Sequence, residues 1–329
     1  MNIDEIAYIA GVSKSTVSRA LNSSGYVSAE TRQRVLDVVQ QSGYRRNLIA
    51  KNLRSKKSNF VGLIIPDIAN EFFSLFAKSL ETNLRKAGFA LFLCNTEERV
   101  ENENFYLESL IDNQVQAIVL TSTSHQIPKK IKYAKIPIVI ADRHIEDTST
   151  HQICCITSDN MHGGQRAVDE LSRRGAKKLL IIADERHMYG TEVRMSAACI
   201  RARENGISSE VRFAHVSAIG GYNVIVNALT KEKLKFDSLF CTTDIFALGA
   251  LRAFSEFHIP IPEMVQVIGF DGIELGAFSN PPLTTFKQDA IGMGEAAADA
   301  IFAMLHHESL QPLRLLPLEF IERSTTLSQ

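Results

Sequence analysis

The sequence has few of the groups on which enzymes and membrane proteins depend. It has 329 residues, no tryptophan and five cysteines, and none of the cysteines forms a Cys-x-x-Cys pair. We find no nucleophile elbow, phosphate-binding loop or His-Glu-x-x-His motif, which argues against the chemistries that use them. His144, His306 and His307 have no partners at metal-ligand spacing, so we expect no metal and no cofactor.

Long hydrophobic runs are also absent. No segment has the 18 or so consecutive apolar residues that a membrane span needs, and the N-terminus lacks the apolar stretch of a signal peptide. The cysteines lie mostly within apolar runs, which suits a reducing compartment. We therefore expect a cytoplasmic protein that does not interact with membranes.

The segment AGVSKSTVSRALN, residues 10–22, predicts an amphipathic helix. Ser13 is a suitable N-cap, and steps of about 100° per residue place Val17 and Leu21 on an apolar face. Lys14 and Arg19 then fall on the opposite face together with hydroxyl groups. Such a face is typical either of an ordinary surface helix or of a helix that contacts an acidic partner.

The flanking segments favour the second interpretation. Residues 2–10 predict a short helix capped by Asn2 and Glu5, and Gly11 follows where a tight turn is needed. A third helix follows Ser28, with Val35, Leu36 and Val39 as packing residues and Gly43 as its stop. Helix, glycine turn and helix form the helix-turn-helix pattern, whose second helix enters the major groove of DNA.

The charge distribution supports contact with nucleic acid. Residues 1–58 contain ten Lys and Arg and four Asp and Glu, a net charge of +6. The whole chain carries −1, so the remainder carries −7. A basic N-terminal unit on an acidic body is the electrostatic signature of a DNA-binding protein.

The remaining 270 or so residues alternate strand-like and helix-like segments. Strands are predicted at 61–65, 90–94, 117–121, 137–141, 179–183, 238–242 and 265–270. Helices are predicted near 71–87, 101–113, 161–174, 190–205, 220–229, 244–257 and 289–306. This alternation predicts an α/β fold with doubly wound parallel sheets, and the length suffices for two subdomains.

Aspartates recur just after the predicted strands. Ligands of open α/β sheets bind beyond the carboxyl ends of the strands, where carboxylates accept hydrogen bonds from sugar hydroxyls. Aspartate is also common at helix N-caps, so each one alone favours a structural role. Together they predict a polar cleft; they are Asp67, Asp142, Asp184, Asp244 and Asp271.

The combined motifs resemble the LacI/GalR family of bacterial transcription factors. The similar segments are DEIAYIAGVSKSTVSRALN, VSAETRQRVLDVVQQSGY, NLIAKNLRSKKSNFVGLIIPDI, GFDG, PPLTTFKQD and IERST, which span essentially the full chain. The resemblance implies a helix-turn-helix headpiece, a hinge helix and a two-subdomain core like that of periplasmic binding proteins. It also implies a homodimer on operator DNA, controlled by a small molecule in the cleft.

The resemblance assigns roles to residues of the headpiece. It places Lys14, Ser15 and Arg19 at base edges, and arginine and lysine can both donate to guanine. Phosphate-contacting or capping roles fit the other polar residues, which are Ser13, Thr16, Ser18 and Asn22. In the hinge, Leu53 matches a leucine that wedges into the minor groove, and Ala50 shares its face. The alternative for this segment is a plain linker, and Arg46 stands where many members have proline.

The resemblance also assigns residues to the effector site. Asp142, Asp271 and Arg194 match effector-binding positions of the family. Among the aspartates, Asp184 has the least support for such a role. Thr243 replaces an asparagine of several sugar-binding relatives, and no tryptophan is available to stack on a sugar. Further expected contacts are Asp67, Phe72, Phe73, Arg143, Asn160, Tyr189, Asp244 and Phe246. This set favours a sugar or sugar phosphate over a purine.

We expect the following organisation. The headpiece spans residues 1–46, the hinge 47–58 and the core 59–329. The N-subdomain takes about 59–155 and 286–314, and the C-subdomain about 156–285 and 315–325. No C-terminal heptad segment follows IERSTTLSQ, so a dimer is expected rather than a tetramer.

Several functional alternatives stay open at this point. The favoured one is a repressor of carbohydrate-utilisation genes that a sugar or sugar phosphate releases from DNA. A catabolite-control regulator with a phosphoprotein corepressor is a second, and a solute-binding protein or a sugar-processing enzyme are less favoured. The basic headpiece argues against the solute-binding protein, and no catalytic group supports the enzyme.

Overall fold

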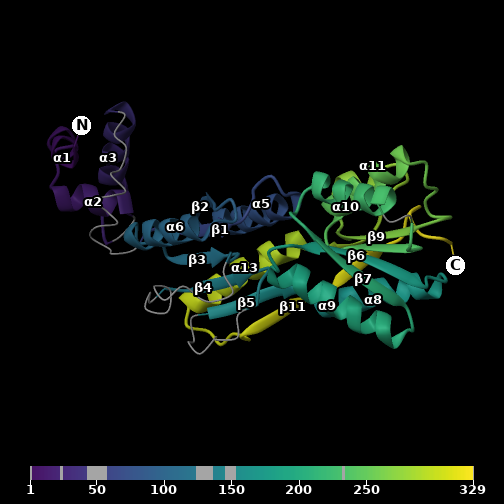
Figure 1. Cartoon of the computed structure of the whole chain (residues 1–329). Helices are drawn as coiled ribbons and strands as arrows, with labels where there is room; N and C mark the ends of the chain where they lie inside the picture. The colour runs from purple at the N-terminus through teal and green to yellow at the C-terminus, as the bar shows by residue number, and fades with distance from the viewer. Residues whose placement is uncertain are drawn as a thin grey trace. The chain divides into compact units, whose positions relative to one another are not determined.

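The chain forms two compact units, residues 1–57 and residues 58–329. The computed structural model describes residues 2–22, 25–42, 58–123, 136–144, 153–231 and 234–328. Figure 1 shows the order of the elements along the chain.

The N-terminal unit contains the three expected helices, α1 (Ile3–Ile9), α2 (Lys14–Asn22) and α3 (Ala29–Ser42). The predicted capping box of α1 is confirmed, since the Asn2 side chain accepts from Glu5 N while the Glu5 carboxylate accepts from Asn2 N. Gly11 has φ +64°, the left-handed conformation that the turn between α1 and α2 requires. Thr16 N donates to the Ser13 hydroxyl at 3.1 Å, which confirms Ser13 as the cap of α2.

The three helices share a small apolar core. Ile6, Val17 and Val35 are fully buried at its centre, one from each helix. The expectation that Leu36 packs inside was wrong, because its side chain is 40% exposed and Val38 contacts the core instead. Gly43, the expected stop of α3, lies outside the described residues.

The first sheet of the large unit is parallel throughout, in the order β11-β5-β4-β3-β1-β2. Its strands are β1 (Phe60–Ile65), β2 (Ala90–Asn95), β3 (Ala117–Leu120), β4 (Ile138–Ala141), β5 (Ile153–Ser158) and β11 (Leu313–Leu316). Helices α5 (Glu71–Lys86) and α13 (Ala290–Leu305) pack on one face, and α6 (Val100–Asp112) packs on the other.

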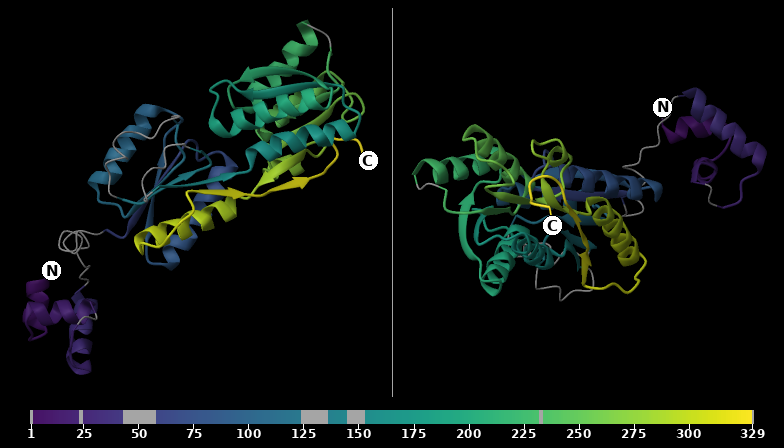
Figure 2. Two further views of the ribbon diagram at one scale, coloured as in Figure 1. Left: turned by 90° about the horizontal axis from the view of Figure 1, so that it is seen from below. Right: turned by 90° about the vertical axis from the view of Figure 1, so that its right-hand side faces the viewer.

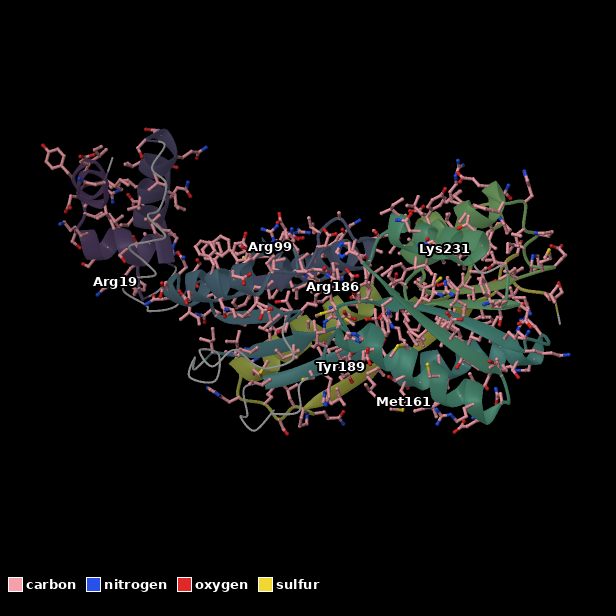
Figure 3. All side chains as sticks on the ribbon, in the orientation of Figure 1. Arg19, Arg99, Met161, Arg186, Tyr189 and Lys231 are labelled. Carbon is pink, nitrogen blue, oxygen red and sulfur yellow. The ribbon has the colours of Figure 1, made fainter. Side chains whose placement is uncertain are left out.

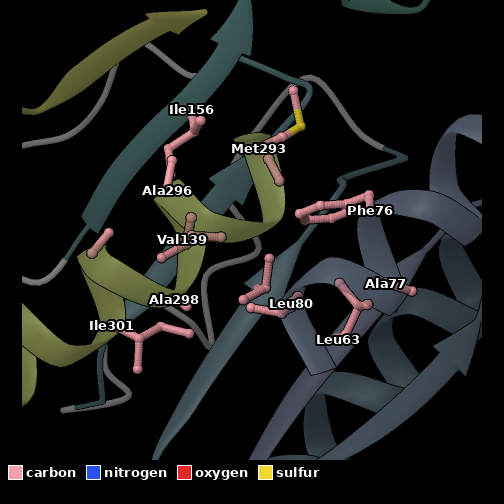
Figure 4. Packing of buried hydrophobic residues seen from close by; sticks show 14 of the residues in the cluster. Leu63, Phe76, Ala77, Leu80, Val139, Ile156, Met293, Ala296, Ala298 and Ile301 are labelled. Atoms are coloured by element: carbon pink, nitrogen blue, oxygen red, sulfur yellow. The ribbon is translucent and has the colours of Figure 1, made fainter. Parts of the chain in front are cut away.

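Alternation along the strands explains these two layers. In β1, Leu63 faces the α5 and α13 side, whereas Ile64 faces α6. Figure 4 shows Leu63 with Phe76 and Leu80 of α5 and with Met293 and Ile301 of α13. Both faces of the sheet are therefore covered, as expected for parallel strands that read as continuous apolar runs.

The second sheet has the order β12-β10-β9-β8-β6-β7, with only β12 antiparallel among its described pairings. Its strands are β6 (Lys178–Asp184), β7 (Ser208–Ala214), β8 (Ser238–Cys241), β9 (Gln266–Asp271), β10 (Thr284–Gln288) and β12 (Leu318–Ile321). Helices α8 (Asn160–Arg173) and α9 (Tyr189–Glu204) cover one face. Helices α10 (Ala218–Lys231) and α11 (Asp244–Glu256) cover the other, and the short α12 (Glu274–Ala277) follows β9.

The chain passes between the two sheets three times, and Figure 2 shows these segments running between the two halves. The passages follow β5, β10 and β11, which end at Ser158, Gln288 and Leu316. The expected boundaries near 155, 285 and 314 were two to three residues too early. They cut through strands, because each of these strands keeps its hydrogen bonds to its own sheet up to its last residues. Among the described residues, no helix has the length and apolar character needed to cross a bilayer.

Candidate functional site

A polar cavity of about 60 Å³ lies between the two sheets. Parallel strands of both sheets point their carboxyl ends toward it, so the loops that follow those strands supply its walls. The first sheet contributes Asn70, Phe72, Phe73, Glu98, Asp142 and Arg143. The second contributes mainly Asp184, Arg186, Thr191, Arg194, Thr243 and Asp271, and Gln288 lies at the second passage.

Arg194 is the central cation of this cavity and is only 3% exposed. Its Nη1 donates to Thr242 O at 2.8 Å and to Asp271 Oδ1 at 3.3 Å. Its Nε donates to Asn160 Oδ1 at 2.7 Å, and its guanidinium lies 3.8 Å from the centre of the Phe270 ring. Asn160 does not line the cavity. Its hydrogen bond to Nε fixes the orientation of the Arg194 guanidinium.

Asp142 and Arg143 form a buried pair directly after β4. Arg143 Nη1 donates to Asp142 Oδ2 at 2.8 Å, and Arg143 Nε donates to Ser122 O at 3.3 Å. Burial raises the pKa of Asp142, while the charges of Arg143 and Arg194 oppose the shift. The second oxygen, Asp142 Oδ1, is buried and has no hydrogen-bond partner.

Asp271 ends β9 in a left-handed conformation with φ +119°. Gln288 Nε2 donates to its Oδ1 at 2.7 Å, and Gln288 Oε1 is left buried without a partner. Burial raises the pKa of Asp271 from 3.8 to about 7, against the opposing charge of Arg194. The backbone strain and the shifted pKa coincide at one residue, a combination typical of functional sites.

Arg186 connects the two subdomains across the cavity. Asp184 accepts from its Nε and Nη2, both at 2.9 Å, and Nη1 forms an ion pair with Glu98 of the first subdomain. A second connection runs from Glu274 N of α12 to the Glu71 carboxylate of α5, at 2.8 Å. Figure 3 shows Arg186 where the two halves of the core meet.

Five of the expected effector contacts do not line the cavity: Asn160, described above, and Asp67, Tyr189, Asp244 and Phe246. Asp67 is exposed and accepts from Ala69 N at 2.9 Å in the loop after β1. Phe246 is fully buried in the core between the second sheet and α11, so a stacking role for it is wrong. Tyr189 begins α9 and lies beside His144, with ring centres 5.9 Å apart, outside the cavity.

Asp244 is also buried outside the cavity, where it holds the loop after β9. Its Oδ2 accepts from Gly272 N at 2.8 Å and from Ile273 N at 2.9 Å, and its Oδ1 accepts from the Thr285 hydroxyl at 2.6 Å. Burial raises its pKa to about 6. Asp244 therefore positions the segment that carries Asp271.

Several residues that line the cavity were not predicted from the sequence as effector contacts. Asn70, Glu98 and Arg186 follow β1, β2 and β6, so the rule that found the aspartates applies to them as well. Gln288 could not be found this way, because β10 itself was not predicted. Asp184, the aspartate least favoured as an effector contact from the sequence, is 2% exposed and accepts a hydrogen bond from Arg186 Nε.

The outer face of α2 has the polar composition expected of a DNA-contacting surface. Lys14, Ser15 and Arg19 are exposed, and Lys14 forms an ion pair with Asp4 of α1. The hydroxyls of Ser15 and Thr16 lie 2.8 and 2.9 Å from that of Ser13. Ser18 is half-buried. Ala50, Leu53 and the side chain of Asn22 lie outside the described part of the structure.

Other chemistry finds little support in the described residues. They contain no group of three or more His, Cys, Asp and Glu placed to hold a metal ion. All five cysteines are free, and burial raises the pKa of Cys94 and Cys154 to about 11, which makes them poor nucleophiles. A larger hollow of about 570 Å³ lies against α13 and β11, but its charged groups are on the exposed surface.

The chain matches two family models. Residues 2–47 match "Bacterial regulatory proteins, lacI family", and residues 168–326 match "Periplasmic binding protein-like domain". The fold is similar to that of the Lac repressor dimer bound to operator and the anti-inducer ONPF. That likeness has a TM-score of 0.89 at 23% identity and covers 100% of this chain and 99% of that one.

Two further proteins are similar in sequence. A periplasmic binding protein/LacI transcriptional regulator from Alkaliphilus metalliredigens QYMF, complexed with D-xylulofuranose, is 29% identical with a TM-score of 0.73. The match covers 82% of this chain and 100% of that one. The ribose operon repressor of Lactococcus lactis subsp. lactis (strain IL1403) is 30% identical over 98% of this chain and 97% of that protein. Because this last match takes in both the helix-turn-helix unit and the two-sheet core, the protein belongs to the LacI family of bacterial regulatory proteins.

Proposed function

We propose that this cytoplasmic protein is a homodimeric repressor of carbohydrate-utilisation genes, released from its operator when a sugar binds between the two sheets. The observation that carries the proposal is the convergence of Asp142, Arg194 and Asp271 in one buried cavity. The relatives support a sugar, since one is named a ribose operon repressor and another was crystallised with D-xylulofuranose. Family membership sets aside the enzyme and the solute-binding protein.

In this proposal the headpiece reads the operator through α2. Lys14, Ser15 and Arg19 contact base edges, while Thr16, Ser18 and Asn22 contact phosphates and set the register. In the hinge, Leu53 enters the minor groove with Ala50 on the same face. The two protomers place their recognition helices on two half-sites of a symmetric operator.

The effector acts by favouring one arrangement of the subdomains. A sugar that contacts Asp142 of the first subdomain and Asp271 of the second binds more tightly when the cleft is closed around it. Closure moves the N-subdomains relative to one another across the dimer and disfavours pairing of the hinge helices. The ligand changes DNA affinity only by its difference in affinity for the two arrangements.

A ligand screen tests the effector half of this proposal. Thermal unfolding of the purified protein is measured with a panel of sugars and sugar phosphates, because a specific ligand raises the apparent unfolding temperature by mass action. Each hit is then added to the protein–operator complex. Release of DNA supports the proposal. Tighter DNA binding would make the ligand a corepressor instead of an inducer. No hit in the panel would favour control by a protein corepressor.

The DNA half is tested with a pair of arginine variants. We expect Arg19→Ala to reduce discrimination between operator and random DNA by about 1–3 kcal/mol, because an arginine bridges two guanine acceptors. Arg34→Ala removes an exposed cation from α3 and serves as the control. Equal effects of the two substitutions on discrimination would show that Arg19 supplies charge but reads no base.

A further inference from the structure

The charged side chains that line the cavity already neutralise one another. Arg143 pairs with Asp142, Arg194 with Asp271, and Arg186 with both Asp184 and Glu98. The lining thus contains three arginines and four carboxylates, a net charge of −1 with every group ionised. An anionic ligand would add negative charge to a buried lining whose arginines are already paired with carboxylates, which is costly.

Three atoms of the cavity lining have no hydrogen-bond partner and can accept hydrogen bonds from a ligand. Asp142 Oδ1, Gln288 Oε1 and Thr243 Oγ1 are all buried without a partner. A carboxylate and an amide oxygen accept only, and a hydroxyl accepts or donates. Hydroxyl groups of an uncharged sugar satisfy all three, whereas phosphate oxygens offer further acceptors to two atoms that cannot donate.

Glu98 and Arg186 form an ion pair from opposite sides of the cavity. Glu98 belongs to the loop after β2, and Arg186 to the loop after β6, so their ion pair joins the two subdomains beside the ligand space. Asp184, which is 2% exposed, fixes the guanidinium through two hydrogen bonds and also accepts from Arg186 N at 3.1 Å. Two carboxylates therefore already pair with the guanidinium of Arg186, which lines the cavity.

From these contacts we infer that Glu98 determines the charge specificity of the cleft. By occupying Arg186, it makes the site select an uncharged sugar and reject the phosphate ester of the same sugar. The inference deepens the proposed function and rests on it, since it concerns the ligand of the same cavity. Neither partner of the ion pair was among the residues expected from the sequence.

Calorimetric titration of single-substitution variants tests the inference. The probes are D-ribose with D-ribose 5-phosphate, D-glucose with D-glucose 6-phosphate, and D-fructose with D-fructose 6-phosphate. We expect the wild type to bind a neutral member at least tenfold more tightly than its ester. Glu98→Gln removes one negative charge beside Arg186 and should raise ester affinity about tenfold, as expected for a charge a few ångströms from the phosphate.

Two further variants separate charge from structure. Glu97→Gln changes the same charge on the adjacent, exposed position of the same loop and should leave the preference unchanged. Arg186→Gln removes the cation and should weaken ester binding still further. If the ion pair acted only as a structural tie, Glu98→Gln and Arg186→Gln would shift ester binding in the same direction. Operator binding by each variant confirms that it is folded.

The outcomes distinguish this inference from the proposed function. Wild-type preference for an ester over its parent sugar would overturn the inference and leave a sugar-controlled repressor intact. An ester affinity that Glu98→Gln does not raise would overturn the role of Glu98. Failure of the wild type to bind any of the six probes, together with no hit from the wider sugar panel in thermal unfolding, would overturn the proposed sugar effector, and the inference with it.

Discussion

At the scale of single residues, two aspartates carry the candidate site, and both sit in left-handed backbone conformations. Asp142 has φ +59° and Asp271 has φ +119°. The strain turns each carboxylate out of its strand and into the space between the sheets, where burial raises both pKa values. Such strain persists only where the surroundings enforce it, and Gln288 and Arg194 do so at Asp271.

We expect Asp271→Asn to weaken effector binding at least tenfold while operator binding is retained. The substitution keeps the shape and tolerates positive φ, but it removes a charged hydrogen-bond acceptor. Asp67→Asn is the matched control, because Asp67 also follows a parallel strand but is exposed and outside the cavity. Ligand titrations and operator release are the measurements. Equal ligand affinities of the two variants would place the effector elsewhere.

Burial of Asp271 also predicts a pH dependence of stability. Its pKa is raised from 3.8 to about 7 in the folded protein, so the folded state binds more protons than the unfolded state between these values. The free energy of unfolding should therefore fall as pH rises from about 4 to about 7, on the order of 2–4 kcal/mol from this group. Asp271→Asn does not titrate, so urea unfolding at several pH values should give it a flatter profile than the wild type.

Sequence alone separated these aspartates only in part. Asp142 and Asp271 were predicted at the cleft and line it, whereas Asp67 and Asp244 stand in the same sequence context and do not. The difference arises from the direction of each side chain, since Asp67 lies in an exposed turn and Asp244 is buried against the loop after β9. No local sequence pattern encodes this direction. Phe246 looked like a stacking residue for the same reason, since one helical turn after a strand can point either into a cleft or into the core.

At the scale of elements, close packing of α8 against α9 positions the central arginine. A Cβ on Gly164 of α8 would lie 2.3 Å from Arg194 O of α9, so only glycine allows this approach. The Asn160 amide at the start of α8 then reaches Arg194 Nε. One glycine in one helix thus sets the position of a cavity side chain on another.

Gly164→Ala should therefore affect both stability and ligand binding. The added methyl group must push α9 away, which costs about 1–3 kcal/mol as in other overpacked cores. The same shift should lengthen the contacts of Arg194 and weaken effector binding. Met161→Ala, on the exposed side of the same helix, is the control. Denaturant unfolding and ligand titration measure the two effects, and a stable variant with normal affinity would contradict the argument.

Element prediction found seven of the twelve strands in the described residues. Six of these seven are buried along most of their length, whereas β2 lies at the edge of its sheet and has no fully buried residue. Strands β7, β11 and β12 lie at sheet edges, where one side is open and the run is broken by polar residues. β10, with the sequence TTFKQ, is central but mostly polar, and β5, with the sequence ICCITS, was not predicted although it is buried throughout. The helices were easier to predict, because caps and apolar spacing mark them locally.

At the scale of the whole molecule, the charge of the chain is divided between its functions. Residues 1–58 carry +6 and the rest carries −7, so attraction to DNA resides in the headpiece. The acidic core contributes no such attraction, and in the proposed function it acts through the hinge. The proposed coupling between the two units is therefore an equilibrium between arrangements rather than a contact of the effector with DNA.

Reciprocity follows from this coupling and is measurable without knowing its structural path. If a sugar lowers operator affinity by some factor, then operator DNA must lower sugar affinity by the same factor, about 5–150-fold for typical couplings. Sugar titrations of the free protein and of the operator complex give the second factor, and operator titrations with and without sugar give the first.

Two variants serve as controls for this measurement. Asp271→Asn should weaken sugar binding to both forms. Arg19→Ala should leave sugar affinity of the free protein unchanged, because it alters only the DNA contact. Unequal factors for the wild type would mean that the sugar and the operator do not act on one shared equilibrium.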